Sequence, residues 1–216
     1  MKSAVCFSAL FLIAIASWEQ SKQAQPSPPP AADNLELRRL FADDMHDRGS
    51  EPFDVDENGK PVPHKEWKES PDMTAHDVIR RKRVREMLNQ GTVRTNNDYT
   101  WASFIFQHGE TPDDYLLAHV LAMVAASRGD KTARWVAAAT LDRYLHSIKR
   151  PQVFGTQFVN GEKGELTQGE YNHDLVSNSL RAAVCVRSYE KQVDQVKQAQ
   201  KQPEAADFNT GQFPCP

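Results

Sequence analysis

The chain has 216 residues, of which 25 % are charged, and its formal net charge is −3. This length fits one ordinary domain with short extensions. The nearly balanced charge gives no basic surplus for binding nucleic acid and no acidic excess of the kind that keeps a whole chain unfolded. Any partner must therefore be recognised by a local feature.

The N-terminal segment has the pattern of a secretory signal peptide. Lys2 precedes an apolar run from Ala4 to Ala16, which ends in small residues before the polar Glu19. A run of about thirteen apolar residues is shorter than the roughly 20 that cross a bilayer as a helix. We expect residues 1–17 to be a signal peptide and the protein to be periplasmic or secreted, with no transmembrane span after its removal.

Export has a consequence for the cysteines. Removal of the signal peptide would leave Cys185 and Cys215 in a compartment that permits oxidation. A disulfide that ties the tail back and a pair of free thiols are both open.

Residues 18–32 are rich in proline and glutamine, and we expect an extended linker there. A helical domain should follow at 33–201, with a tail at 202–216. The domain begins with apolar residues at helical spacing, which predict a helix with Asp33 as N-cap and Gly49 as terminator.

A second helix is predicted from an N-cap at Thr74 to about Gln90, with Ile79 and Val84 facing inward. It follows a Pro-rich loop. Its other face carries a cluster of cations, Arg80, Arg81, Lys82, Arg83 and Arg85. We interpret this cluster as a solvated helix face, and binding to an anionic surface is the alternative.

Three further helices are predicted in close succession, at 97–108, 111–128 and 130–149. The middle one is apolar nearly all round and should be the most buried. These features predict an all-α fold, an irregular helical bundle around a central helical hairpin that resembles one unit of a helical repeat. A last long helix is predicted at 174–187, with a further one to Gln200.

Two polar residues fall on the inward stripes of this helix trio. His108 lies on that of the first helix and Asp142 on that of the third. A buried carboxylate needs a partner or loses its charge, so we expect His108, His119 or Arg143 to pair with Asp142.

The loop after the third helix should fold back over this end of the domain. Its polar side chains would then either cap helix carbonyls or reach a ligand. The candidate polar cluster comprises His108, Asp142, Arg143, Gln152, Thr156 and Gln157.

Two functions follow from this cluster. One is a binding or interaction module that accepts a peptide or another envelope component. The other is a hydrolase that uses His108 as base, with Asp142 and Arg143 orienting it or the substrate. The lack of a recognised catalytic signature favours the binding module.

Metal motifs are incomplete. Asp54–Gly59 matches the opening of a calcium loop, but the twelfth position is Lys65 instead of the required Glu. Asp142 and His146 have an i, i+4 spacing that can hold zinc, without an evident third ligand. We expect no metal and no cofactor.

Three motifs stand in a specific order: Gln107-His108, Leu141-Asp142-Arg143 and the run Gln152–Gln157. Together they resemble an uncharacterised bacterial family, a domain of unknown function, over residues 95–160, with an extension to Leu180-Arg181 and Cys185. The resemblance implies a helical fold and shared pocket residues, and no particular reaction. The chain departs from the family's pattern at Phe154, where a tyrosine is expected.

Overall fold

The structure is a computed structural model that describes residues 31–48 and 72–201. The predicted signal peptide, most of the linker, the Asp54–Gly59 motif and the tail with Cys215 lie outside the described residues. Residues 31–216 fall into one compact unit, described here by itself.

The fold is mostly helical, which confirms the all-α prediction. The helices are α1 (Leu35–Asp47), α2 (Met73–Asn89), α3 (Asn96–Gln107), α4 (Pro112–Ser127), α5 (Lys131–Ser147), α6 (Asn178–Ala183) and α7 (Tyr189–Lys201). Two short strands that the sequence did not predict, β1 (Val159–Asn160) and β2 (Leu166–Thr167), pair antiparallel in the loop after α5.

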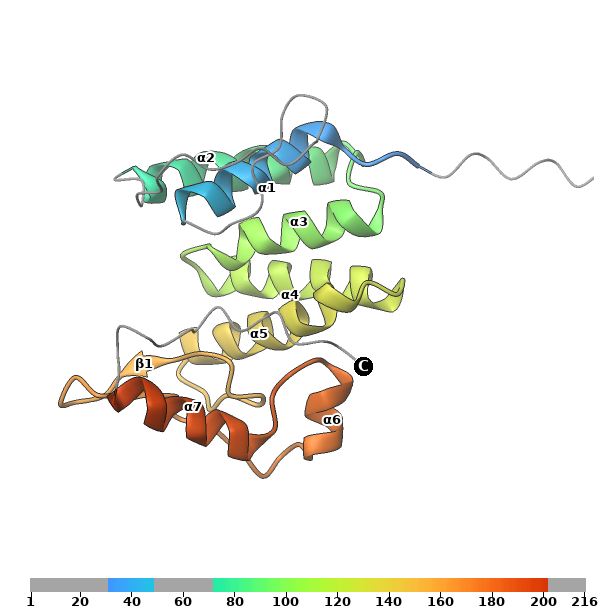
Figure 1. The fold of residues 1–216 in the computed structure, drawn as a ribbon. Coiled ribbons are helices and arrows are strands. Elements are labelled where there is room, and N and C mark those ends of the chain that lie inside the picture. The colour runs from blue at the N-terminus through green and yellow to red at the C-terminus, as the bar shows by residue number, and fades with distance from the viewer. Residues whose placement is uncertain (1–30, 49–71, 202–216) are drawn as a thin grey trace, which may run out of the picture. The chain divides into compact units, whose positions relative to one another are not determined.

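The helices stack mainly in sequence order. Figure 1 shows α3, α4 and α5 in successive layers, with α1 and α2 side by side next to α3. The α4–α5 pair is the predicted central hairpin. The chain after α5, including the small sheet, α6 and α7, lies on the side of α5 opposite to α4 (Figure 1).

The N-caps of this stack are local polar contacts. Thr111 and Asp130, at the starts of the helices predicted at 111–128 and 130–149, cap α4 and α5. α1 is capped by Asn34 instead of the predicted Asp33, because the Asn34 side chain accepts the N–H of Leu37 at 3.1 Å. The buried Asp98 completes the capping box of α3 and also accepts the backbone N–H of Asn34 at 2.8 Å, so one carboxylate fixes the start of two helices.

The prediction for α2 was wrong in detail. Asp72, not Thr74, precedes the helix. Ile79 is 64 % exposed, whereas Arg80 and Arg81 are only 5 % and 8 % exposed. Both cations face inward because carboxylates lie there to pair with them. The predicted solvated basic face therefore does not include Arg80 and Arg81.

The larger core cluster joins the first four helices through buried side chains such as Leu37, Phe41, Met87 and Phe106. A smaller cluster joins α4 and α5. α4 is less buried than predicted, because Leu116, Val120 and Met123 are 39 %, 50 % and 55 % exposed. A helix in the middle of a stack has two covered faces, and its outer stripe stays in solvent. Within the described ranges, no helix is both long and apolar enough to cross a membrane.

The predicted helix at 174–187 is much shorter in the structure. Ser177 caps α6, and the helix ends where Cys185 adopts a left-handed φ of 61°. The N–H of Val186 then bonds to the carbonyl of Arg181 at 2.8 Å, a closure typical of a helix C-terminus. Cys185 is disulfide-bonded. Since Cys6 and Cys215 both lie outside the described residues, pairing with Cys215 stays a prediction.

Candidate functional site

A buried carboxylate organises the loop after α5. Asp142 is fully buried, and its Oδ1 accepts the backbone N–H of Val153 at 2.7 Å and of Phe154 at 3.0 Å. Its Oδ2 accepts both the N–H of Thr156 at 2.9 Å and the hydroxyl of the same residue at 2.8 Å. Burial raises the pKa of Asp142, while these four donors oppose that rise. Asp142 is therefore paired with its own loop and not with a histidine or Arg143.

Two glutamines complete this loop. Gln152, which is fully buried, accepts the N–H of Gln157 at 2.8 Å and donates to the Gln157 carbonyl at 3.0 Å. The Gln157 side chain reaches back to the Ala139 carbonyl on α5 at 3.1 Å. Gln152 and Gln157 thus bond to backbone groups. The sequence had left two roles open for these side chains, capping and ligand binding, and these bonds correspond to the capping role.

The carbonyl of Phe154 is the second anchor of the loop. It accepts three side-chain donors: the hydroxyl of Tyr171 at 3.0 Å, Nη1 of Arg181 at 3.1 Å and Nε2 of Gln192 at 2.8 Å. Arg181 is fully buried and Gln192 is 3 % exposed. A tyrosine hydroxyl therefore reaches this loop from position 171, although position 154 itself is a phenylalanine.

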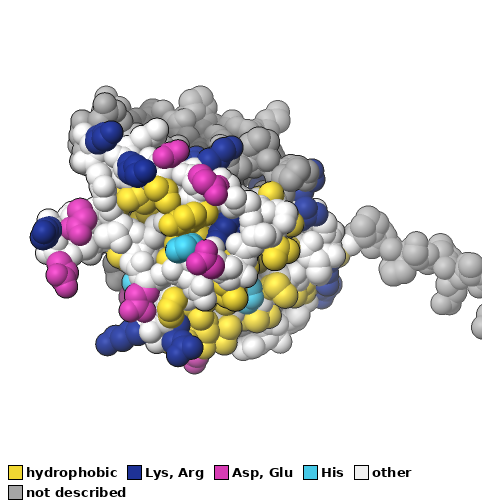
Figure 2. Space-filling view, turned by 90° about the horizontal axis from the view of Figure 1, so that it is seen from below, with side chains coloured by type: hydrophobic (Ala, Val, Ile, Leu, Met, Phe, Trp, Pro, Cys, Tyr) yellow, Lys and Arg dark blue, Asp and Glu magenta, His cyan; other side chains and the backbone are white. Residues whose placement is uncertain are grey.

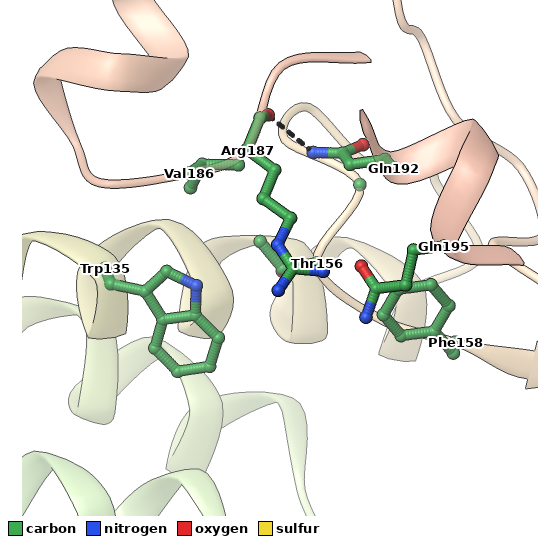
Figure 3. A pocket seen from close by; sticks show the side chains of 8 residues that line it. Trp135, Thr156, Phe158, Val186, Arg187, Gln192 and Gln195 are labelled. Atoms are coloured by element: carbon green, nitrogen blue, oxygen red, sulfur yellow. Dashed lines mark hydrogen bonds between the residues drawn. The ribbon is translucent and has the colours of Figure 1, made fainter. Parts of the chain in front are cut away.

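These anchors hold one wall of a pocket between α5, the loop and α7. The pocket has a volume of about 290 Å³, opens to solvent and is lined by Trp135, Gly155, Thr156, Phe158, Val186, Arg187, Gln192 and Gln195. In Figure 3 the Arg187 side chain extends into it between Trp135 on one side and Gln195 and Phe158 on the other. Figure 2 views this end of the unit from below, where hydrophobic side chains gather with charged ones around them.

His108, at the C-cap of α3, belongs to a different cluster. Its Nδ1 lies 2.9 Å from Oδ2 of Asp44, a fully buried carboxylate of α1. Burial lowers the pKa of His108, Asp44 opposes this, and the nearby Arg48 and Arg143 lower it further. The sequence placed His108 on an inward face correctly, but its carboxylate partner is Asp44.

The same cluster continues into α2 as a network of ion pairs. Nη2 of Arg80 lies 2.7 Å from Asp47 and 2.9 Å from Asp77. Arg48 bridges Asp44 at 2.9 Å and also bonds to Asp77. These pairs neutralise Arg80, and they hold α1 against α2.

The structure therefore divides the predicted cluster. Asp142, Gln152, Thr156 and Gln157 come together in the loop, whereas His108 has its polar contacts at Asp44. No hydrogen bond or ion pair joins the side chains of Arg143 and Asp142. Its guanidinium lies 5.9 Å from the ring of Tyr115, and burial lowers its pKa.

Two other predicted histidines have minor roles. Nδ1 of His119 lies 2.9 Å from the carbonyl of Ala137, which joins α4 to α5. His146 is exposed. Among the residues that the structure describes, no group of three His, Cys, Asp or Glu side chains could hold a metal ion.

Sequence reasoning missed several residues of both clusters. The apolar pattern of the first helix does not indicate that Asp44 faces inward. Trp135 of α5 is half-buried, and Tyr171, Arg181 and Gln192 come from segments far along the chain. The Leu180-Arg181 pair at the edge of the family resemblance was the one signal for Arg181.

Comparisons with protein families, with curated proteins and with solved structures found no match for this chain.

Proposed function

We propose that this protein is an exported binding module and that its ligand is a peptide segment held in the Trp135 pocket. The proposal rests on the buried polar groups that hold the loop of the pocket wall in place. Asp142, Gln152 and Arg181 are all fully buried and all bond to this loop or its neighbours. Burying three such groups is costly unless they are hydrogen-bonded, and the bonds that satisfy them are the ones that fix the loop.

What they fix is the shape of a binding surface. A pocket held open before the ligand arrives avoids the entropic cost of ordering a loop on binding. The pocket is shallow, because its volume of about 290 Å³ includes open solvent, so it suits one anchoring side chain better than a large cofactor.

The lining also fits a peptide. Trp135 and Phe158 supply apolar walls for an anchoring side chain. The amide of Gln195 and the guanidinium of Arg187 supply polar groups that can bond to peptide carbonyls or carboxylates. This combination of aromatic anchor and planar polar groups is frequent where peptides are recognised.

The test is selection of peptides from a random library on the full exported chain, with affinities measured by titration. We expect Trp135→Ala to weaken the selected peptides about tenfold or more, which matches the loss of a buried aromatic contact. Gln195→Ala should weaken them less. Gln198→Ala, an exposed glutamine of the same helix, is the matched control. Peptides that bind Trp135→Ala as tightly as the parent chain would refute the proposal.

A hydrolase is the second candidate, and one observation favours it: the contact between His108 and the buried Asp44. A carboxylate on Nδ1 holds the ring so that Nε2 can act as a base. Under this alternative Asp44 takes the role that the sequence gave to Asp142. Hydrolysis of ester and phosphoester panels should then fall about 100-fold or more in His108→Asn. Equal rates in the two chains would exclude it.

A further inference from the structure

Among the described residues, Arg143 is a cation without a counter-charge. Within residues 31–48 and 72–201, no carboxylate and no hydrogen-bond acceptor pairs with its guanidinium, and its Nε is buried without a partner. Its one aromatic neighbour is Tyr115, whose hydroxyl is already bonded to the carbonyl of Gly109 at 2.8 Å. Partly buried guanidinium groups in folded proteins are normally paired, because removing their charge from water is costly.

The other buried arginines show the contrast. Arg80 forms ion pairs with three carboxylates, those of Asp44, Asp47 and Asp77. Arg181 donates to two backbone carbonyls. Arg143 has neither kind of partner, so the fold keeps an uncompensated positive charge beside α3 and α4.

His108 provides a second unused group at the same place. Its Nδ1 faces Asp44, so its Nε2 points away, and Nε2 has a contact with Nε2 of Gln107 at 3.4 Å, which is a weak one. The His108 side chain is 15 % exposed, so a small ligand can reach it. Tyr115 places the two groups at the same end of the fold, because its ring lies 5.9 Å from the Arg143 guanidinium and its hydroxyl bonds to the carbonyl of Gly109, the residue after His108.

The other charged groups around His108 are paired with one another. α1 supplies Asp44 and, at its end, Arg48, which pair with each other. Arg81 of α2 donates to the His108 carbonyl at 2.9 Å and lies near Asp114 and Glu110. Arg143 is the unbalanced charge that remains.

We propose that a compact oxyanion, with the chemistry of a phosphate, a sulfate or a carboxylate, binds between the Arg143 guanidinium and Nε2 of His108. The planar guanidinium offers paired donors that match two oxygens of such a group. A protonated His108 would add a third donor, with Asp44 holding the ring on its other side. This site is separate from the Trp135 pocket, and it requires no reaction.

Sulfate is the first probe, because its charge stays constant over the working pH range. Titration calorimetry on the full chain should give a dissociation constant of about a millimolar or tighter. Sulfate binding should tighten as pH falls from about 8 to 5.5, since the bound anion favours protonated His108. Inorganic phosphate and acetate form the two further arms, which distinguish a phosphate ligand from a carboxylate ligand.

Variants decide whether the site is the one proposed. Arg143→Met should lower sulfate affinity about tenfold or more, and Arg143→Lys should restore part of it. His108→Asn should keep sulfate binding but remove its pH dependence. Arg150→Met, at an exposed arginine just after α5, should change neither. The proposal is overturned if no anion binds, or if Arg143→Met binds sulfate as the parent chain does while its melting temperature shows that it is folded.

Discussion

Thr156 donates to the same oxygen of Asp142 twice, through its backbone N–H at 2.9 Å and through its hydroxyl at 2.8 Å. The other carboxylate oxygen accepts two more N–H groups of the loop. One side chain of α5 thus replaces the hydrogen bonds that a regular strand or helix would give to residues 153–156. The loop keeps a defined shape without regular secondary structure.

Replacement of Asp142 by asparagine should therefore destabilise the fold. Asparagine puts an NH₂ group where N–H and O–H donors converge, so at least one buried donor loses its acceptor. We expect the free energy of unfolding to fall by about 2 to 4 kcal/mol. Urea denaturation measures it. Asp194→Asn, at an exposed position of α7, should stay within about 0.5 kcal/mol of the parent chain. A similarly small effect in Asp142→Asn would contradict this account of the loop.

Gly155 should tolerate alanine much less well than Gly91 does. Both have positive φ, 72° and 65°. A Cβ at Gly155 would lie 2.5 Å from Cε1 of Tyr171 and 2.6 Å from Oε1 of Gln192, whereas one at Gly91 meets nothing within 4 Å. Gly91→Ala should cost about 1 kcal/mol of stability from backbone strain alone. Gly155→Ala should cost about 2 to 5 kcal/mol, because overpacking is added.

Thermal unfolding of the two glycine variants provides the comparison. Equal losses of stability would show that Gly155 is needed for its backbone angle only and that the loop does not pack closely on Tyr171 and Gln192.

The stability of the fold should depend on pH through His108. Burial lowers its folded pKa below the ordinary value of 6.5. The unfolded chain therefore takes up a proton that the folded chain does not, and stability is full above pH 6.5 and is lost as pH falls through the folded pKa. His108→Asn keeps a donor for Asp44 and should flatten this dependence. His146→Asn, at an exposed histidine, should leave it unchanged. Denaturation curves between about pH 8 and 5 measure the slopes.

Tyr171 should titrate later than the other tyrosines. Burial raises the pKa of its hydroxyl to about 12, against an ordinary value of 10.0. The neutral hydroxyl is the form that donates to Phe154, so its contribution to stability is complete below pH 10.0 and disappears as pH rises through about 12. Ultraviolet titration of phenolate should show one late step that Tyr171→Phe removes. A late step that persists in this variant would assign the shift to another tyrosine.

Helix positions could be predicted from the sequence where a cap or an apolar stripe marks them. The helices predicted at 111–128 and 130–149 begin where Thr111 and Asp130 cap α4 and α5. The stripe of α5 also placed Asp142 in the interior. Periodicity identifies the covered face of a helix, because burial of that face is what creates the pattern.

The partners of buried charges could not be predicted in the same way. The sequence suggested a histidine or Arg143 for Asp142, but the donors are mainly backbone N–H groups, which every loop residue carries and no pattern marks. Arg80 and Arg81 were assigned to a solvated face because cations usually lie there. The burial of Arg80 depends on carboxylates of α1, such as Asp47 at a separation of 33 residues, and that of Arg81 on Asp114 of α4.

The stack of α3, α4 and α5 has a consequence for how the chain acquires its structure. Each of these helices packs on its neighbour in sequence, so the contacts close short loops and should form early in folding. The bond from Gln192 to Phe154 spans 38 residues and should form late. We expect amide hydrogens of α6 and α7 to exchange through partial openings that leave the three stacked helices protected. The segment that completes the Trp135 pocket would then be the first to separate from the fold under mild denaturant.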